Sequence, residues 1–117
     1  MLRKTYRKIG TIIRRTYGPQ QHSVKEAVIQ KYREHYGMQV FIETGTFLGE
    51  MVEAMKNSFK KVYSIELNEK LYEKAKERFV NDHNVSIIHG DSGSILSSLL
   101  KNTVSLLYFN ILPYRGN

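Results

Sequence analysis

The chain has 117 residues, a formal net charge of +7 and no cysteine. This length accommodates one domain with a modest core, and the absence of cysteine excludes disulfides and thiolate metal sites. The apolar runs are too short to span a membrane, and no secretory signal follows the basic N-terminus. We therefore expect a cytoplasmic protein.

The positive charge is concentrated at the N-terminus. Residues 1–20 contain six lysines and arginines and no acid, whereas the other 97 residues carry 12 basic and 11 acidic side chains. Apolar side chains recur among these cations at helical spacing: Leu2, Tyr6, Ile9, Ile12 and Ile13. This pattern predicts an N-terminal basic amphipathic helix. Such an arm suits an anionic membrane surface, which would make the protein peripheral to the membrane. Nucleic acid is a weaker alternative, and packing of the apolar stripe on a protein surface is the simplest one.

Beyond Gly18-Pro19, residues 21–117 form the predicted domain, in which helical and extended patterns alternate. The first helix begins near Ser23 and stops at Gly37. The expected inner face of this helix comprises Ala27, Val28, Tyr32 and Tyr36. A strand follows at about 39–43. A second helix then carries an inward stripe of Val52, Met55 and Phe59.

The alternation continues to the C-terminus. The sequence "KVYSIEL" (61–67) predicts a strand, and Asn68 caps a helix with Leu71, Ala75 and Phe79 facing inward. The remaining predicted elements are a strand at 85–90, a short helix marked by Ile95, Leu96, Leu99 and Leu100, and a strand at 104–110. This rhythm predicts an α/β fold, a partial Rossmann-like parallel sheet with flanking helices. We expect the strand order 3-2-1-4 that is typical of such sheets.

Each of the first three predicted strands ends in an acidic residue: Glu43, Glu66 and, one position later, Asp91. Ligands of such folds bind beyond the carboxyl ends of the strands. Gly45 and Gly49 allow a tight turn there that exposes backbone N–H groups. Glu66 follows Gly45 by 21 residues, close to the ~20-residue interval at which a strand-end acid pairs with ribose hydroxyls. Acidic groups around one loop suit a ligand with a ribose, a base and a positive charge, as in S-adenosylmethionine.

Three segments in this order carry a family resemblance: "VFIETGTFLGE", "VYSIELNEKLYEKAKERF" and "VSIIHGDSGSIL". Together they resemble the cofactor-binding half of class I S-adenosylmethionine-dependent methyltransferases, over roughly residues 38–101. The resemblance implies that one set of residues lines the methionine part of the cofactor: Glu43, Thr44, Gly45, Thr46, Phe47 and Gly49. It further implies that Glu66 binds the ribose hydroxyls beside Leu67 at the adenine, and that Asp91 and Ser92 contact the adenine amino group. The implied activity is methyl transfer to an acceptor that the sequence does not identify.

Other interpretations of these residues stay open. The acids could act only as helix caps or dipole partners. "TGTFLG" also matches the start of the loop in short-chain dehydrogenases, which bind NAD(P), although Met51 replaces the last glycine of that motif. The four histidines show no ligand-like spacing, so no metal site is predicted.

The C-terminal sequence "YFNILPYRGN" departs from the family pattern. Asn110 stands where similar proteins carry an acid, no histidine follows, and the chain stops after the fourth predicted strand. We therefore expect a truncated or frame-shifted product, and no catalytic residue can be named. A catalytically inactive remnant or a nucleotide-binding module is the alternative to an active enzyme. The apolar run at 106–109 would leave a sheet edge able to pair with another chain, which predicts self-association.

Overall fold

The computed structural model of the chain describes residues 22–102 and 107–111. The predicted basic arm at residues 1–20 lies outside these residues. Eight elements are described: α2 (His22–Tyr36), β1 (Val40–Thr44), α3 (Glu50–Met55), β2 (Lys61–Glu66), α4 (Glu69–Arg78), β3 (Val85–His89), α5 (Ser92–Asn102) and β4 (Leu107–Ile111). The order of helices and strands agrees with the prediction from the sequence.

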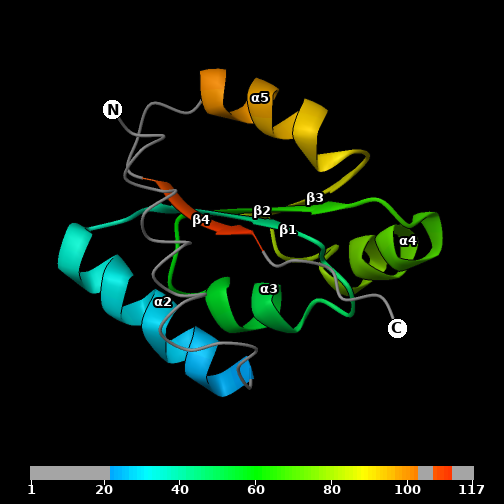
Figure 1. Cartoon of the computed structure of the whole chain (residues 1–117). Coiled ribbons are helices and arrows are strands. Elements are labelled where there is room, and N and C mark those ends of the chain that lie inside the picture. The colour runs from blue at the N-terminus through cyan, green and yellow to red at the C-terminus, as the bar shows by residue number, and fades with distance from the viewer. Residues whose placement is uncertain (1–21, 103–106, 112–117) are drawn as a thin grey trace.

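The strands form one parallel sheet in the order β3-β2-β1-β4, as predicted. In Figure 1 the sheet is seen edge-on, with α5 above it and with α2 and α3 below it. Each connection between strands that are consecutive in the sequence contains a helix, as the parallel pairing of β1 with β2 and of β2 with β3 requires. The fold is therefore α/β and Rossmann-like, with helices on both faces of the sheet.

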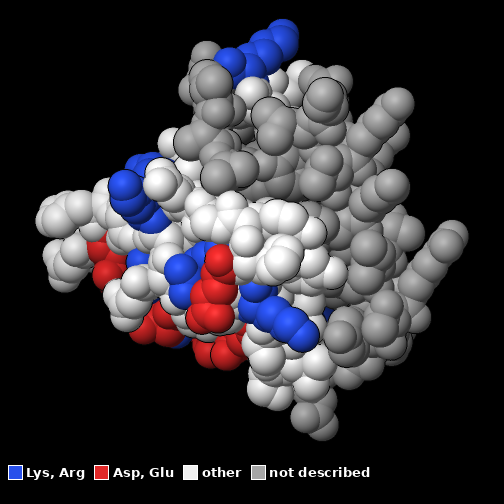
Figure 2. Space-filling view, turned by 90° about the vertical axis from the view of Figure 1, so that its left-hand side faces the viewer, with Lys and Arg blue, Asp and Glu red and all other residues white. Residues whose placement is uncertain are grey.

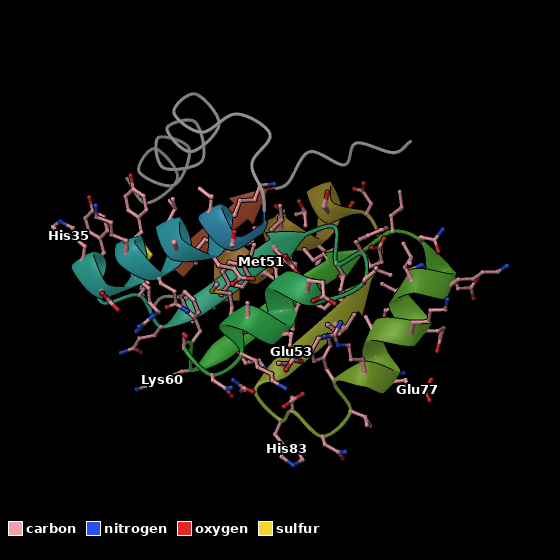
Figure 3. The ribbon with its side chains drawn as sticks, turned by 90° about the horizontal axis from the view of Figure 1, so that it is seen from below. His35, Met51, Glu53, Lys60, Glu77 and His83 are labelled. Carbon is pink, nitrogen blue, oxygen red and sulfur yellow. The ribbon has the colours of Figure 1, made fainter. Side chains whose placement is uncertain are left out.

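The larger core cluster lies between the sheet and the helices on the face of α2 and α3. Met51, Val52 and Met55 of α3 are buried there, and Figure 3 views the molecule from this side with Met51 labelled. The rings of Phe41 and Phe59 lie 5.4 Å apart between their centroids. Phe59 is buried as predicted, but it follows the end of α3 instead of continuing its stripe.

The inner face of α2 differs from the prediction. Ile29 is the buried residue of this helix, at 1% exposure, and Tyr32 packs against the same cluster. Ala27 is exposed and Tyr36 retains 46% of its accessible surface. Apolar residues occur around much of this helix, so its spacing alone did not distinguish the buried side.

The opposite face of the sheet is covered by α5. Val40 and Ile42 of β1 are buried there beneath Leu96, Leu99 and Leu100 of the helix. These three leucines belong to the stripe predicted for the short third crossover helix. Burial of both faces of β1 explains why its sequence reads as an almost continuous apolar run.

Charges on the described surface are mixed. Figure 2 shows Lys and Arg side chains lying directly beside Asp and Glu side chains on one face of the molecule. Three ion pairs join α3 and its C-cap Lys56 to α4 and the turn that follows it: Arg78 with Glu50 and Glu53, and Lys56 with Asp82. Among the described residues, no group of three or more His, Cys, Asp and Glu could hold a metal ion, and no helix has the length and apolar character needed to cross a membrane.

Candidate functional site

The carboxyl ends of β1, β2 and β3 meet at one edge of the sheet, where the predicted site residues lie. Backbone hydrogen bonds extend the pairing of the strands into the loops. The amide of Gly45 donates to the carbonyl of Ile65 at 2.7 Å, and the amide of Gly90 donates to the carbonyl of Glu66 at 3.0 Å. The loops after β1 and β3 are thus both attached to the end of β2.

The carboxylate of Glu66 organises this edge. Its Oε1 accepts a hydrogen bond from the amide of Phe47 at 2.9 Å, and its Oε2 accepts one from the amide of Asn68 at 2.9 Å. The residue is only 7% exposed. Each carboxylate oxygen has two lone-pair sites, so the bonds from the described residues leave one further acceptor site on each oxygen.

The loop between β1 and α3 has an unusual backbone. Gly45 and Gly49 adopt φ values of 83° and 87°, and Phe47 adopts 50°, which is uncommon for a residue with a side chain. Phe47 and Leu48 expose 56% and 53% of their surface, and Leu67 in the next loop exposes 71%. Three large apolar side chains therefore stand in solvent at the edge where ligands of this fold bind.

The two glycines of the loop serve different purposes. No atom lies within 4 Å of the position that a Cβ on Gly45 would occupy, so the space beside it is open. A Cβ on Gly49 would lie 2.7 Å from the ring of Phe79. Gly49 is therefore required for packing of the loop against α4, whereas Gly45 borders room for a ligand.

Glu43 lies in the interior instead of at the rim. It is 1% exposed, and its Oε1 accepts a hydrogen bond from Ser64 Oγ at 2.8 Å. Ser64 Oγ lies 2.6 Å from Thr46 Oγ1. Since Ser64 donates its proton to Glu43, Thr46 donates to Ser64. Among the described residues, Glu43 is linked to the loop through two hydroxyl groups, and its predicted contact with a ligand stays a prediction.

Burial changes the ionisation of Glu43. Desolvation, opposed by the hydrogen bond from Ser64 and assisted by the negative charge of Glu66, raises the pKa of the Glu43 carboxyl from 4.5 to about 8. The side chain is therefore mostly neutral at pH 7. A neutral carboxyl group avoids the large cost of burying an unpaired charge at the end of a strand.

Asp91 caps α5. Its Oδ2 accepts hydrogen bonds from the amide of Ser94 at 3.1 Å and from Ser94 Oγ at 3.3 Å. This is the capping arrangement that the sequence left open as an alternative to ligand binding. Asp91 is also exposed at the edge beside Glu66 and Leu67, so capping does not prevent contact with a ligand. Ser92 is half-buried, and Thr44 is buried at the end of β1.

Two other residues at this edge, His89 and Tyr72, were not predicted from the sequence. His89, the partner of Glu66 in the strand register, has its Nε2 3.0 Å from the carbonyl oxygen of Leu67. Its ring stacks on Tyr72, with centroids 5.0 Å apart. Together they support the loop that carries Leu67. The signal in the sequence was the position of His89 at the end of a predicted strand. A search for metal-ligand spacing among the histidines does not detect a residue of this kind.

No protein-family model matches the sequence, and no curated protein matches it. Solved structures do match its fold. The O-methyltransferase TomG from Streptomyces achromogenes, solved with SAM, is 18% identical over 82% of this chain and 47% of its own, with a TM-score of 0.57. An O-methyltransferase from Bacillus cereus, solved with SAH, is 12% identical over 95% of this chain and 63% of its own, with a TM-score of 0.59.

A third similar structure is CalS10, a SAM-bound amino pentose methyltransferase from Micromonospora echinaspora. It is 19% identical over 62% of this chain and 30% of its own, with a TM-score of 0.51. The chain thus spans less than two thirds of each of these structures. The chain has the Rossmann-like fold of class I S-adenosylmethionine-dependent methyltransferases.

Proposed function

We propose that this chain binds S-adenosylmethionine at the carboxyl edge of its sheet, as the cofactor-binding part of a methyltransferase. The observation that carries the proposal is Glu66. Its carboxylate is nearly buried and fixed by two backbone amides, and the described residues leave one acceptor site on each oxygen. Two free acceptor sites on one carboxylate suit the two hydroxyls of a ribose.

The surroundings of Glu66 fit the other parts of the cofactor. Leu67 offers an exposed apolar surface for the adenine, and the open space beside Gly45 can admit the methionine part. Asp91 would meet the adenine amino group. The neutral Glu43 would hold the loop from beneath through Ser64 and Thr46. The cofactor would supply the methyl group of its sulfonium, which would be transferred to a nucleophile of an unidentified acceptor with S-adenosylhomocysteine as the leaving group.

Binding of NAD(P) is the competing interpretation. Glu43 is buried, so it would not press on a pyrophosphate as a surface acid would. The fold comparisons favour the methyltransferase interpretation, and a direct titration distinguishes the two.

Calorimetric titration of the full chain with S-adenosylhomocysteine, S-adenosylmethionine and NADH tests the proposal. We expect binding of the first two compounds and none of NADH. Glu66→Ala should weaken binding by about 1.5–3 kcal/mol, because it removes charge-assisted hydrogen bonds. Glu73→Ala, at an exposed position of α4, is the matched control and should bind normally. Binding of NADH alone, or unchanged affinity in folded Glu66→Ala, would overturn the proposal.

A further inference from the structure

Arg78 at the end of α4 reaches the loop between β1 and α3. Its Nη1 donates to the carbonyl oxygen of Leu48 at 2.7 Å and to Glu50 Oε1 at 2.9 Å. Its Nη2 lies 3.8 Å from Glu53 Oε2, and Figure 3 shows Glu53 between α3 and α4. A residue 30 positions away in the sequence therefore contacts the backbone of the loop that carries Phe47 and Leu48.

The contact with Leu48 complements the one made by Glu66. Glu66 holds the amide of Phe47 from the side of β2, and Arg78 holds the carbonyl of Leu48 from the side of α4. The backbone torsions of both residues lie between these two anchors, including the φ of 50° at Phe47. This uncommon conformation needs surrounding contacts to persist, and these two side chains supply them.

The packing beneath the loop brings Arg78 within reach. The guanidinium carbon of Arg78 lies 5.2 Å from the centroid of the Phe79 ring, and the same ring lies where a Cβ on Gly49 would be. The loop can approach α4 this closely only because residue 49 is glycine. The guanidinium is thus close to both the Phe79 ring and the loop backbone.

The contacts of Arg78 differ in what they stabilise. The side chains in its ion pairs are partly exposed, at 35% for Arg78, 60% for Glu50 and 44% for Glu53. Exposed ion pairs contribute little to the stability of a fold because water screens them. The charge-assisted bond to the Leu48 carbonyl instead fixes a peptide group. Loss of Arg78 should therefore affect the loop more than the stability of the whole domain.

We propose that Arg78 is a positioning residue that holds the loop after β1 in the conformation that presents Phe47 and Leu48 to a ligand. As a statement about cofactor affinity this rests on the proposed function. As a statement about the loop it stands on the contacts of Arg78, Glu66 and Gly49 alone. Arg78 touches no ligand itself and acts through the Leu48 carbonyl.

Two measurements on three full-length variants test this role. Arg78→Met keeps an unbranched stem against Phe79 and removes the donors, Arg78→Lys retains one donor group, and Glu50→Ala removes an ion-pair partner but keeps the bond to Leu48. Amide hydrogen exchange would be followed at Phe47 and Gly49 and, as a reference for the domain, in β1. Affinity for S-adenosylhomocysteine would be measured by calorimetry.

In Arg78→Met, exchange at Phe47 and Gly49 should accelerate about tenfold while β1 is unchanged, because one charge-assisted bond is lost. The dissociation constant should rise by a similar factor of about ten. Arg78→Lys should recover part of both effects, and Glu50→Ala should show neither. Unchanged loop exchange in Arg78→Met, equal acceleration throughout β1, or an equal effect of Glu50→Ala would each overturn the inference. If the unmodified chain does not bind S-adenosylhomocysteine, the proposed function fails, and the exchange data still decide the role of Arg78.

Discussion

Glu43 and Ser64 face each other across β1 and β2 and share a hydrogen bond of 2.8 Å that is closed off from solvent. Both residues are polar at positions where the strands are buried, with exposures of 1% and 0%. Among the described side chains, Ser64 is the hydrogen-bond partner of Glu43, and Thr46 completes the group at the loop. The pair links the interior of the sheet to the candidate site.

The first prediction concerns the pH dependence of stability. The pKa of Glu43 is raised by burial to about 8 in the folded chain, from 4.5. Between these values the unfolded chain releases a proton that the folded chain retains, so this group lowers the stability of the fold as pH rises. The loss is on the order of a few kcal/mol and is complete above the folded pKa.

Glu43→Gln should remove this dependence, because glutamine stays neutral and can still accept a hydrogen bond from Ser64. Denaturant unfolding of both proteins at pH 5 and pH 8.5 would measure the difference. The variant should lose less stability than the unmodified chain between these two conditions. Parallel losses in the two proteins would show that Glu43 does not retain its proton on folding.

The second prediction concerns Ser64. Ser64→Ala should destabilise the fold by about 1–3 kcal/mol, because it leaves the buried groups of Glu43 and Thr46 without their shared partner. Ser97→Ala, at an exposed position of α5, is the control and should change stability little. Thermal or denaturant unfolding would measure both. A Ser64→Ala variant as stable as the control would show that water or another group satisfies Glu43.

The third prediction separates two ways in which replacing a glycine destabilises the fold, namely backbone strain and steric overlap of the added Cβ. Gly37 and Gly49 have φ values of 62° and 87°, but only Gly49 would place a Cβ against Phe79. Gly37→Ala should therefore cost about 1–2 kcal/mol from backbone strain alone. Gly49→Ala should cost roughly 2–4 kcal/mol, because overpacking is added to the strain. Equal destabilisation of the two variants, measured by denaturant unfolding, would mean that the Phe79 ring moves aside freely.

The fourth prediction distinguishes capping from ligand contact at Asp91. Asp91→Asn keeps an acceptor for the amide of Ser94, whereas Asp91→Ala loses it and should cost about 1 kcal/mol of stability. If Asp91 also accepts a hydrogen bond from the adenine amino group, both variants should weaken cofactor binding, Asp91→Ala by more. Calorimetry and thermal unfolding together measure the two effects. Normal cofactor affinity in a folded Asp91→Ala variant would show that Asp91 caps α5 and does not contact the ligand.

The fifth prediction concerns the N-terminal arm. Deleting residues 1–20, which contain six cations and no acid, should abolish binding to vesicles with anionic lipid and leave cofactor affinity intact. A full-length variant with the six cations changed to glutamine separates charge from the apolar stripe and should bind vesicles weakly. Sedimentation with vesicles of increasing anionic content measures this. Binding that survives the deletion would place any membrane contact elsewhere.

The sequence predicted the order of the elements because strand and helix periods differ and turn residues separate them. It also placed Glu66, Gly45 and Gly49 at one edge, since parallel strands bring their carboxyl ends together. The inner face of α2 was predicted wrongly. Ile29 is buried there in place of Ala27 and Tyr36, because an apolar residue lies on several sides of that helix and tertiary packing selects among them.

Contacts across long sequence separations could not be predicted. Whether Glu43 turns inward depends on the register that sets Ser64 opposite it, 21 residues later. In the sequence, Arg78 is indistinguishable from a solvated cation on a helix. Its contact with the Leu48 carbonyl becomes evident only from the position of α4 beside the loop. The resemblance to methyltransferases supplied a set of positions, whereas the structure shows which of them are exposed and which are buried.

The end of β2 connects three loops through a single residue. Glu66 accepts bonds from Phe47 and Asn68 with its side chain and from Gly90 with its backbone. The effects of substitutions in these loops on stability should therefore not be additive, because each loop contacts Glu66 and a change in one loop alters the contacts of the others. A residue change that one loop tolerates in this chain can be harmful in a chain of the same fold with a different neighbouring loop. Transfer of a single loop between such proteins should fail where transfer of all three together succeeds.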